Sequence, residues 1–354
     1  MKKTRSRSGV RRAAVLTSAS LLAGRRLARR QLDRARRASD WTVLRPGFGR
    51  PSIVHRVCAE DGVELTVYES GVADASTTVV LLHGWTLSSE IWDSVAQELG
   101  SSLRVLRVDH RGHGRSERGP EWGLTMDQLG RDVGAVLDKL VPEGHVVLAG
   151  HSMGGMTIMH LAAQRPEQFG SRVRGVVLVA TSIGDLANLD LGLPWPLARV
   201  VQRYGSSALR RLAALESRMS PVGPVPAELW FAVRSLNYGP GVPARHVDDM
   251  IRVVRRTPLG VVSAFYAALL QHDGARGIPG LLKVPVAILV GDSDRLTPVS
   301  HANKIAAHLP EASLKVIPDV GHMIVQECPE VVASVVRELV PQSKGLELIA
   351  SGAR

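Results

Sequence analysis

Short apolar runs alternate with helical patterns along most of this chain, and this alternation constrains its fold more than any other feature. The runs at 77–84, 145–152, 172–180 and 284–294 are largely continuous rather than alternating, as expected of strands buried on both faces of a sheet. A stretch such as 126–141 places apolar residues three and four positions apart, which is typical of an amphipathic helix. The pattern predicts an α/β fold with a mostly parallel sheet and helices on both faces.

Eight strands are expected in this sheet. The segments 55–61 and 63–70, separated by Gly62, predict an opening antiparallel hairpin. The runs 104–114 and 313–319 complete the set of eight.

The strand pattern stops between residues 182 and 283, where helical segments are punctuated by proline. We interpret this insertion, which precedes the seventh strand, as a helical cap over the carboxyl edge of the sheet, where open α/β sheets bind ligands. The expected organisation is a basic arm at 1–40, a core at 41–181 and 284–341 interrupted by the cap at 182–283, and a tail at 342–354.

The basic charge is confined to the N-terminal arm. Residues 1–40 hold 13 Lys and Arg residues and two acidic residues, which accounts for the formal net charge of +11 of the whole chain. The remaining residues are balanced in charge, and no nucleic-acid motif accompanies the arm, so a nucleic-acid partner is not expected.

The arm itself allows three interpretations. Its apolar stretch at 13–24 is too short to cross a bilayer, which takes about 20 residues. We favour a helix on an anionic membrane surface; a solvated extension, disordered or cleaved, and an export signal are the alternatives. The expected location is therefore cytoplasmic or peripheral to a membrane, rather than exported.

The two cysteines, Cys58 and Cys328, lie far apart and outside any metal-ligand spacing. Neither a disulfide framework nor a structural zinc site is expected from them. We expect no metal and no cofactor.

The segment "VVLAGHSMGG" at 146–155 places Ser152 between an apolar strand and a helix. A serine on such a sharp turn needs small neighbours, and Gly150 and Gly154 stand two residues before and after it. The turn exposes the hydroxyl at the start of a helix, where the backbone amides favour negative charge. We therefore interpret Ser152 as a nucleophile.

A serine hydroxyl needs a base to take its proton and an acid to orient that base. His322 follows the last expected strand, and Asp294 ends the strand before it, so both should lie at the same edge of the sheet as Ser152. Asp292, two residues earlier, and Asp185, after the preceding strand, are alternative acids.

The backbone amides of Met153 and Trp85 are the expected donors to an oxyanion. Trp85 follows a strand at Gly84, which lets the chain turn. Candidates for the lining of the substrate pocket are the following residues: Trp85, His151, Trp195, Trp230 and Phe231.

Over residues 52–340 the chain resembles the capped α/β hydrolases. Five motifs in family order carry the resemblance: His83-Gly84-Trp85, "DHRGHGRS" from Asp109 to Ser116, "GHSMGG", "GDSDRLTP" and the "GH" that ends at His322. The resemblance implies a nucleophile at Ser152, an acid at Asp294, a base at His322, and oxyanion amides at Trp85 and Met153. It also implies a structural turn, rather than metal ligands, at His110 and His113.

The resemblance implies a cofactor-free serine esterase, and the apolar cap residues favour a lipophilic small-molecule ester. Serine at the turn counts against the epoxide hydrolases and haloalkane dehalogenases of this fold, which use aspartate there. Acyl transfer, perhydrolysis and C–C hydrolysis remain alternatives with the same triad. A non-catalytic ligand-binding protein of the same fold is the alternative of another class.

Overall fold

The computed structural model describes residues 24–37, 53–186, 205, 207–211, 213–214 and 225–341. Eight strands form one sheet in the order β1-β2-β4-β3-β5-β6-β7-β8. β1 pairs with β2, and β2 with β4, in antiparallel fashion; every other pair is parallel. The strands are β1 (Ile53–Cys58), β2 (Glu64–Ser70), β3 (Thr77–Leu82), β4 (Arg104–Val108), β5 (His145–His151), β6 (Val173–Val179), β7 (Val286–Gly291) and β8 (Ser313–Ile317). The expected eight-stranded, mostly parallel sheet is confirmed.

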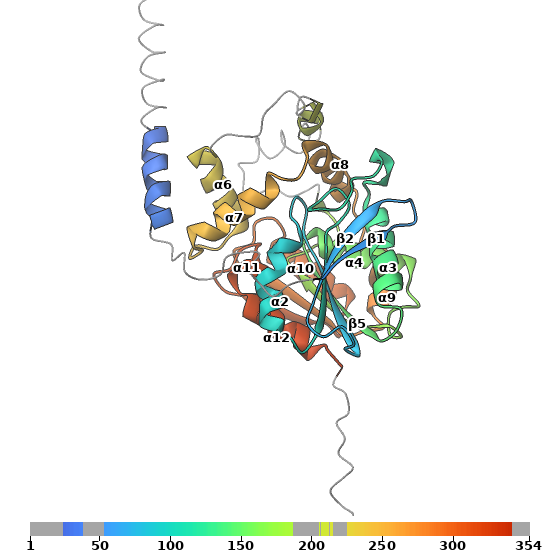
Figure 1. Cartoon of the computed structure of the whole chain (residues 1–354). Helices are drawn as coiled ribbons and strands as arrows, with labels where there is room; N and C mark the ends of the chain where they lie inside the picture. The colour runs from blue at the N-terminus through green and yellow to red at the C-terminus, as the bar shows by residue number, and fades with distance from the viewer. Residues whose placement is uncertain are drawn as a thin grey trace, which may run out of the picture.

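Helices cover both faces of this sheet (Figure 1). Alternate residues of one strand enter different cores: Val79 and Leu81 belong to one buried cluster, and Val80 and Leu82 to another. The first cluster packs against α2 (Asp93–Leu99), α11 (Ile324–Glu327) and α12 (Pro329–Glu338). The second packs against α3 (Met126–Leu140), α4 (Met153–Gln164), α9 (Ile278–Leu281) and α10 (Val299–His308). Three short 3-10 helices complete the described body: η1 (Ser89–Trp92), η2 (Glu121–Gly123) and η5 (Ala275–Gly277).

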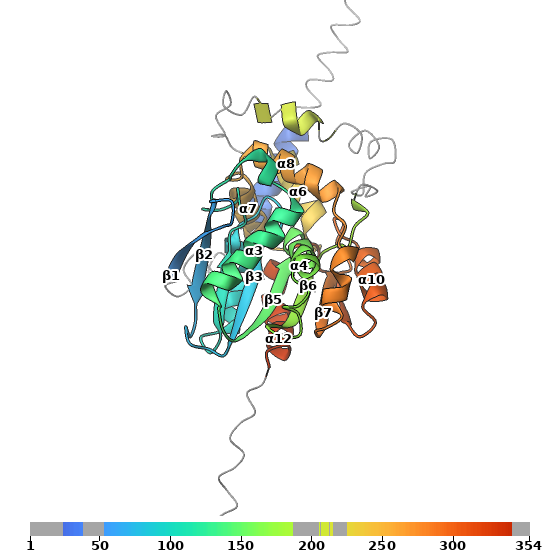
Figure 2. The same cartoon turned by 90° about the vertical axis from the view of Figure 1, so that its right-hand side faces the viewer.

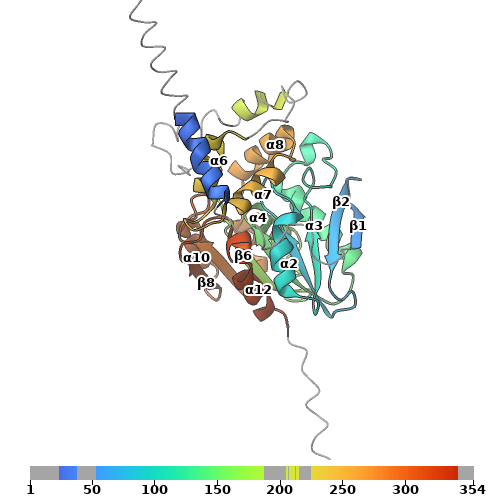
Figure 3. The same ribbon diagram turned by 60° about the vertical axis from the view of Figure 1, so that its left-hand side comes forward.

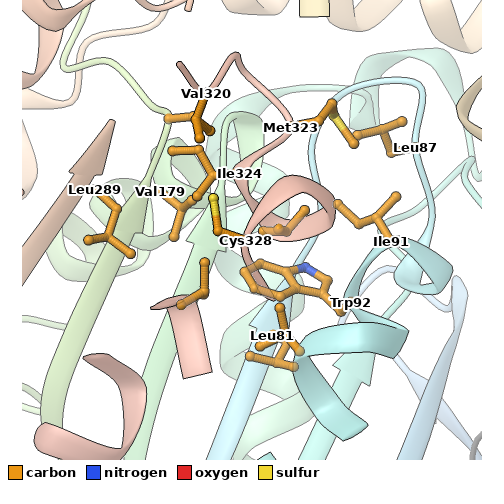
Figure 4. Packing of buried hydrophobic residues seen from close by; sticks show 14 of the residues in the cluster. Leu81, Leu87, Ile91, Trp92, Val179, Leu289, Val320, Met323, Ile324 and Cys328 are labelled. Atoms are coloured by element: carbon orange, nitrogen blue, oxygen red, sulfur yellow. The ribbon is translucent and has the colours of Figure 1, made fainter. Parts of the chain in front are cut away.

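The first cluster reaches from the sheet to the loop after the last strand. Leu81 and Trp92 pack below Ile324 and Cys328, and Met323 lies beside Leu87 (Figure 4). Burial raises the pKa of the Cys328 thiol to about 11, so this side chain packs as an apolar group. Cys58 and Cys328 are both free cysteines.

Among the residues that the structure describes between β6 and β7, the helices α6 (Ala227–Asn237), α7 (Ala244–Val254) and α8 (Leu259–Leu270) precede η5 and α9. They lie together beyond one end of the strands (Figure 2). Hydrogen bonds to the loops after the strands hold them there. Among these, the Thr257 hydroxyl donates to the Thr86 carbonyl at 3.0 Å, and the Met323 N–H donates to the Asn237 carbonyl at 3.0 Å. Thr86 follows β3 and Met323 follows β8, so these helices contact the carboxyl edge of the sheet.

Residues 24–37 of the basic arm form a helix that packs beside α6 and α7 (Figures 1 and 3). Leu32 is buried in the first cluster, and Arg36 donates to both carboxylate oxygens of Asp248 on α7, at 2.9 and 2.7 Å. Arg25 forms an exposed ion pair with Glu228 on α6 at 3.6 Å. This part of the arm is therefore not a free extension, while most of the apolar stretch 13–24 lies outside the described residues.

No single helix among the described residues has the length and hydropathy to cross a membrane. Only α7 and α8 together meet that test, and they are bent by 99° at the break between them.

Candidate functional site

Ser152 stands on a strained turn between β5 and α4. Its φ of 52° and ψ of −117° are conformations that a residue with a side chain rarely adopts. The Ser152 N–H donates to the Val179 carbonyl at 2.9 Å, which ties the turn to β6. A Cβ on Gly150 would lie 2.4 Å from the Gly154 carbonyl carbon, and one on Gly154 would lie 2.2 Å from the Leu82 carbonyl oxygen. Both glycines are therefore required by backbone contacts.

His322 and Asp294 meet at the same edge of the sheet. The Nδ1 atom of His322 lies 2.9 Å from Oδ2 of Asp294, and both side chains are buried. A carboxylate accepts only, so Nδ1 carries the proton and Nε2 is the free acceptor in the neutral ring. This is the tautomer that a general base requires.

The Asp294 carboxylate is further held by its own loop. Oδ1 accepts from the N–H groups of Leu296 and Thr297 at 2.8 and 2.9 Å, and Oδ2 accepts from the Thr297 hydroxyl at 2.8 Å. Burial acts to raise the pKa of Asp294, but His322 and the Thr297 hydrogen bonds outweigh it and lower the pKa below its ordinary value. Asp294 is therefore ionised when it orients His322.

The two alternative acids make different contacts. Asp292 accepts from the Asp319 N–H at 2.9 Å and from the Ser293 hydroxyl at 3.0 Å, and so fixes the loop backbone. Asp185 is ion-paired with Lys304 at 2.7 Å at the surface. Asp294 is the carboxylate that contacts His322.

His151 connects the turn at Ser152 to the loop that carries His322. Its Nε2 donates to the carbonyl oxygen of His322 at 2.9 Å, and the two rings lie 4.8 Å apart. Burial lowers the pKa of His151 to about 3, so the ring is neutral. His322 is thereby held against the residue that precedes Ser152.

The turn after β3 lies directly beside Ser152. A Cβ on Gly84 would lie 3.2 Å from Cβ of Ser152 and 3.0 Å from Nδ1 of His151. Within the part of the chain that the structure describes, the N–H groups of Trp85 and Met153 have no hydrogen-bond acceptor. Trp85 lies near Ser152 because it follows Gly84, and Met153 is the next residue after Ser152 in the chain.

Two buried histidines hold this turn in place. The His83 ring donates from Nδ1 to the Gly84 carbonyl at 2.8 Å and accepts the His110 N–H at 3.0 Å. The His113 ring donates from Nδ1 to the Arg111 carbonyl at 3.0 Å and accepts the Thr86 N–H at 3.2 Å. Burial lowers the pKa of His83 to about 4 and that of His113 to about 3, which keeps both rings neutral and able to accept.

These histidines are positioning groups for Gly84–Thr86, a role that no spacing in the sequence signalled for His83. Thr86 needs the support, because its φ of 63° is unfavourable for a β-branched residue. No group of three His, Cys, Asp or Glu residues among those described could hold a metal ion.

The expected pocket residues occupy different environments. Trp85 is half-buried, stacks on Tyr266 of α8 with ring centroids 5.7 Å apart, and packs against an apolar cluster. That cluster contains Leu124, Met126, Leu129, Met153, Met156, Val261, Phe265 and Leu269. Trp85 is thus the aromatic candidate that the structure places beside Ser152.

Two of the other candidates, Trp230 and His151, are buried, and Phe231 is partly buried. Trp230 is 1% exposed, and its indole N–H donates to Asp248 at 2.8 Å. Phe231 contacts Trp230 edge to face at 5.0 Å, and His151 is wholly buried. Neighbouring side chains and backbone enclose both Trp230 and His151, and their place in the lining of a pocket stays a prediction. Trp195 lies outside the described residues.

A model of the alpha/beta hydrolase fold family matches residues 77–327, and the chain therefore belongs to the α/β hydrolase family. The sequence is 27% identical over 261 residues to a pimeloyl-[acyl-carrier protein] methyl ester esterase of Nitrosomonas europaea, covering 71% of this chain and 91% of the relative. It is 28% identical over 259 residues to a bifunctional esterase/perhydrolase of Acinetobacter calcoaceticus, covering 72% and 87%.

Solved structures agree at the level of the fold. A thermophilic esterase from Thermogutta terrifontis superposes with a TM-score of 0.64 at 24% identity, covering 81% of this chain and 97% of that one. Fold and sequence relatives together define the chain as an esterase-like α/β hydrolase.

Proposed function

We propose that this protein is a serine esterase in which Ser152 is the nucleophile, His322 the base and Asp294 the acid that orients the base. The observation that carries the proposal is the buried 2.9 Å contact between His322 Nδ1 and Asp294 Oδ2, because it leaves His322 Nε2 as a proton acceptor beside the Ser152 turn. Ester hydrolysis is the activity that the named relatives share.

In the first half of the reaction, His322 Nε2 takes the Ser152 hydroxyl proton as Oγ attacks the ester carbonyl carbon. The Trp85 and Met153 N–H groups donate to the oxygen that becomes negative, each contributing about 3 kcal/mol. Asp294 stabilises the imidazolium. The His322 proton then passes to the leaving alcohol as the C–O bond breaks, which leaves an acyl group on Ser152.

In the second half, a water molecule gives a proton to His322 Nε2 and attacks the acyl carbon. The same two amides bind the oxyanion. The proton returns to Ser152 Oγ as the carboxylic acid leaves, and the enzyme is restored.

A fluorophosphonate probe tests the triad, because it labels a serine only when that serine is activated. We expect stoichiometric labelling of the wild type, none of Ser152→Ala, and labelling at least about 100-fold slower in His322→Gln. Circular dichroism spectra of the three proteins verify that the variants fold. No labelling of the wild type, or labelling that persists in Ser152→Ala, contradicts the proposal.

The substrate we propose has a lipophilic acyl chain. The support is the apolar cluster against which Trp85 packs, which includes Met153 and Met156 at the start of α4. Methionine side chains are flexible and can adapt to aliphatic chains of different length. For p-nitrophenyl esters, we expect kcat/KM to rise from acetate to octanoate; a steep preference for acetate contradicts this substrate class.

We also propose that the helix at 24–37 binds an anionic membrane surface. We call the helices α6, α7 and α8 with their connecting segments the insert. The apolar side of the helix at 24–37 faces this insert through Leu32, while arginines are exposed on its remaining surface. The exposed residues are Arg25, Arg26, Arg29, Arg30, Arg34 and Arg37, with Leu27 59% exposed among them. Each such arginine contributes about 1 kcal/mol near anionic lipid.

Sedimentation with lipid vesicles tests this binding. We expect the protein to sediment with vesicles containing phosphatidylglycerol and not with phosphatidylcholine alone. Replacing Arg26, Arg29 and Arg30 by Gln should weaken binding at least about tenfold. The matched control replaces three exposed bases of the body (Lys139, Arg174 and Lys315) and should bind as the wild type does. Equal binding of both variants, or salt-sensitive binding to DNA in place of vesicles, contradicts the proposal.

A further inference from the structure

The loop that carries His322 is bonded to the insert on both sides of the histidine. On one side, the Gly321 N–H donates to Glu327 Oε1 at 2.9 Å, and the Gly239 N–H donates to Oε2 of the same carboxylate at 2.8 Å. On the other side, the Met323 N–H donates to the Asn237 carbonyl at 3.0 Å. Glu327 thus connects the loop of His322 to residues 237–239, at the end of α6.

The two segments also touch backbone to backbone. A Cβ on Gly321 would lie 2.5 Å from Cα of Tyr238, and one on Gly239 would lie 1.9 Å from the Asp319 carbonyl oxygen. Tyr238 is buried, and its hydroxyl donates to the His246 carbonyl at 2.8 Å and contacts Gln326 Oε1 at 2.7 Å. At such contacts a small displacement of the segment 237–239 displaces the loop of His322.

We propose that Glu327 is a positioning residue for the base, which locks the His322 loop onto the insert and places a second carboxylate near the imidazole. The inference rests on the proposed role of His322. It adds a residue outside the triad, and it makes the segment 237–239 of the insert part of the support of the base.

We expect the charge of Glu327, like its hydrogen bonds, to support the function of His322. Burial and the nearby Asp294 raise the pKa of Glu327 above its ordinary value, although the amides of Gly239 and Gly321 and the nearby His322 act to lower it. Both carboxylate oxygens accept N–H groups, as an ionised carboxylate does. The titratable groups that face it are Asp294 and His322, with Tyr238 beside it and Asp249 of α7 beyond the tyrosine. A negative charge here favours the imidazolium that forms at His322 during the reaction.

Glu327→Gln tests the proposal, because the amide keeps the shape but loses the charge and turns an NH₂ group toward a backbone N–H. We expect kcat to fall about tenfold with KM within about twofold of the wild-type value. We also expect the acidic limb of the kcat/KM profile to move to lower pH by at least about 0.3 unit, because the imidazolium loses a nearby negative charge. Glu330→Gln, three residues on and exposed, is the matched control and should change neither.

Two further variants separate positioning from a loss of stability. Tyr238→Phe removes the hydroxyl contacts but leaves Glu327 in place, so we expect a lower Tm with an unmoved pH profile. Glu327→Asp keeps the charge but is too short to reach both amides, so kcat should fall while the acidic limb stays. If Glu327→Gln does not fold, Glu327→Asp tests the proposal alone: a wild-type kcat in this variant overturns the positioning role.

Wild-type labelling by the fluorophosphonate probe separates the two proposals. If the wild type labels and Glu327→Gln keeps the wild-type kcat and pH profile, the role of Glu327 is overturned while the triad stands. The role of Glu327 is also overturned if Glu327→Gln and Tyr238→Phe each lose activity only in proportion to their fall in Tm. If the wild type does not label, it is the triad that fails.

Discussion

Gly84 is the residue on which the proposed oxyanion site depends most directly, because there is no room for a side chain between the turn after β3 and the serine. An alanine Cβ there would press on Nδ1 of His151 and on Cβ of Ser152, at 3.0 and 3.2 Å. The turn would have to move away, and the Trp85 N–H would move with it.

We therefore expect Gly84→Ala to lower kcat about 10- to 100-fold with little change in KM, as the loss of an oxyanion donor does. Steady-state kinetics on a p-nitrophenyl ester measures both parameters. Gly241→Ala is the control, because nothing lies within 4 Å of the new methyl group. A wild-type kcat for Gly84→Ala would mean that the Trp85 amide does not act in the reaction.

At the residue scale, side chains that follow buried strands could be predicted from the sequence. His322 and Asp294 are such residues, and the structure brings them together. The positions of Trp230 and Glu327 could not be predicted in this way. Each depends on partners outside its own helix, Asp248 for the indole and the Gly239 and Gly321 amides for the carboxylate, and no periodicity signals such contacts.

At the scale of elements, the Asp248 carboxylate connects the helix at 24–37 to both α6 and α7. Asp248 accepts two N–H groups from Arg36 and one from the Trp230 indole. Hydrogen bonds to a charged group in a partly buried site contribute about 1.5–3 kcal/mol each.

We expect Asp248→Asn to release this helix, because an amide oxygen cannot accept all three donors. Trypsin should then cleave within 24–37 at least about fivefold faster than in the wild type, since cleavage requires local opening. Mass spectrometry of the fragments locates the sites. Asp74→Asn, on an exposed turn, should leave the rate unchanged, and equal rates for both variants would exclude Asp248 as the anchor.

The strands of the sheet could be predicted because short, continuous apolar runs that alternate with helical patterns are typical of strands buried on both faces. The packing of the helix at 24–37 could not. Its arginines outnumber its apolar residues, so its composition is that of a solvated segment. The contacts that hold it are the ion pairs with Asp248 and Glu228 and the buried cluster that includes Leu32.

At the scale of the whole molecule, buried neutral histidines make the fold sensitive to acid. Burial lowers the pKa to about 4 at His83 and His272, and to about 3 at His113 and His151. In the unfolded chain these rings titrate near 6.5, so between pH 6.5 and 4 the unfolded state binds more protons than the folded state. The free energy of unfolding therefore falls as the pH falls through this window.

We expect the free energy of unfolding in urea to decrease by at least about 1.4 kcal/mol per pH unit between pH 6 and 5. His113→Gln retains an acceptor for the Thr86 N–H and should reduce the slope. His308→Gln, on the surface, should not. A stability that stays constant from pH 7.5 to 5 would show that these rings are not neutral in the folded protein.

The attachment of the His322 loop to residues 237–239 has a consequence for protein engineering. If His322 is the base, as we propose, the insert of this chain cannot be exchanged to alter the substrate range alone, because its α6 end also supports the His322 loop. A chimera that takes its insert from a relative but keeps residues 237–239 would change the substrate contacts and leave that support in place. A chimera in which residues 237–239 are exchanged as well would change both the substrate contacts and the support of the His322 loop. The difference in kcat between the two chimeras would measure the contribution of that support.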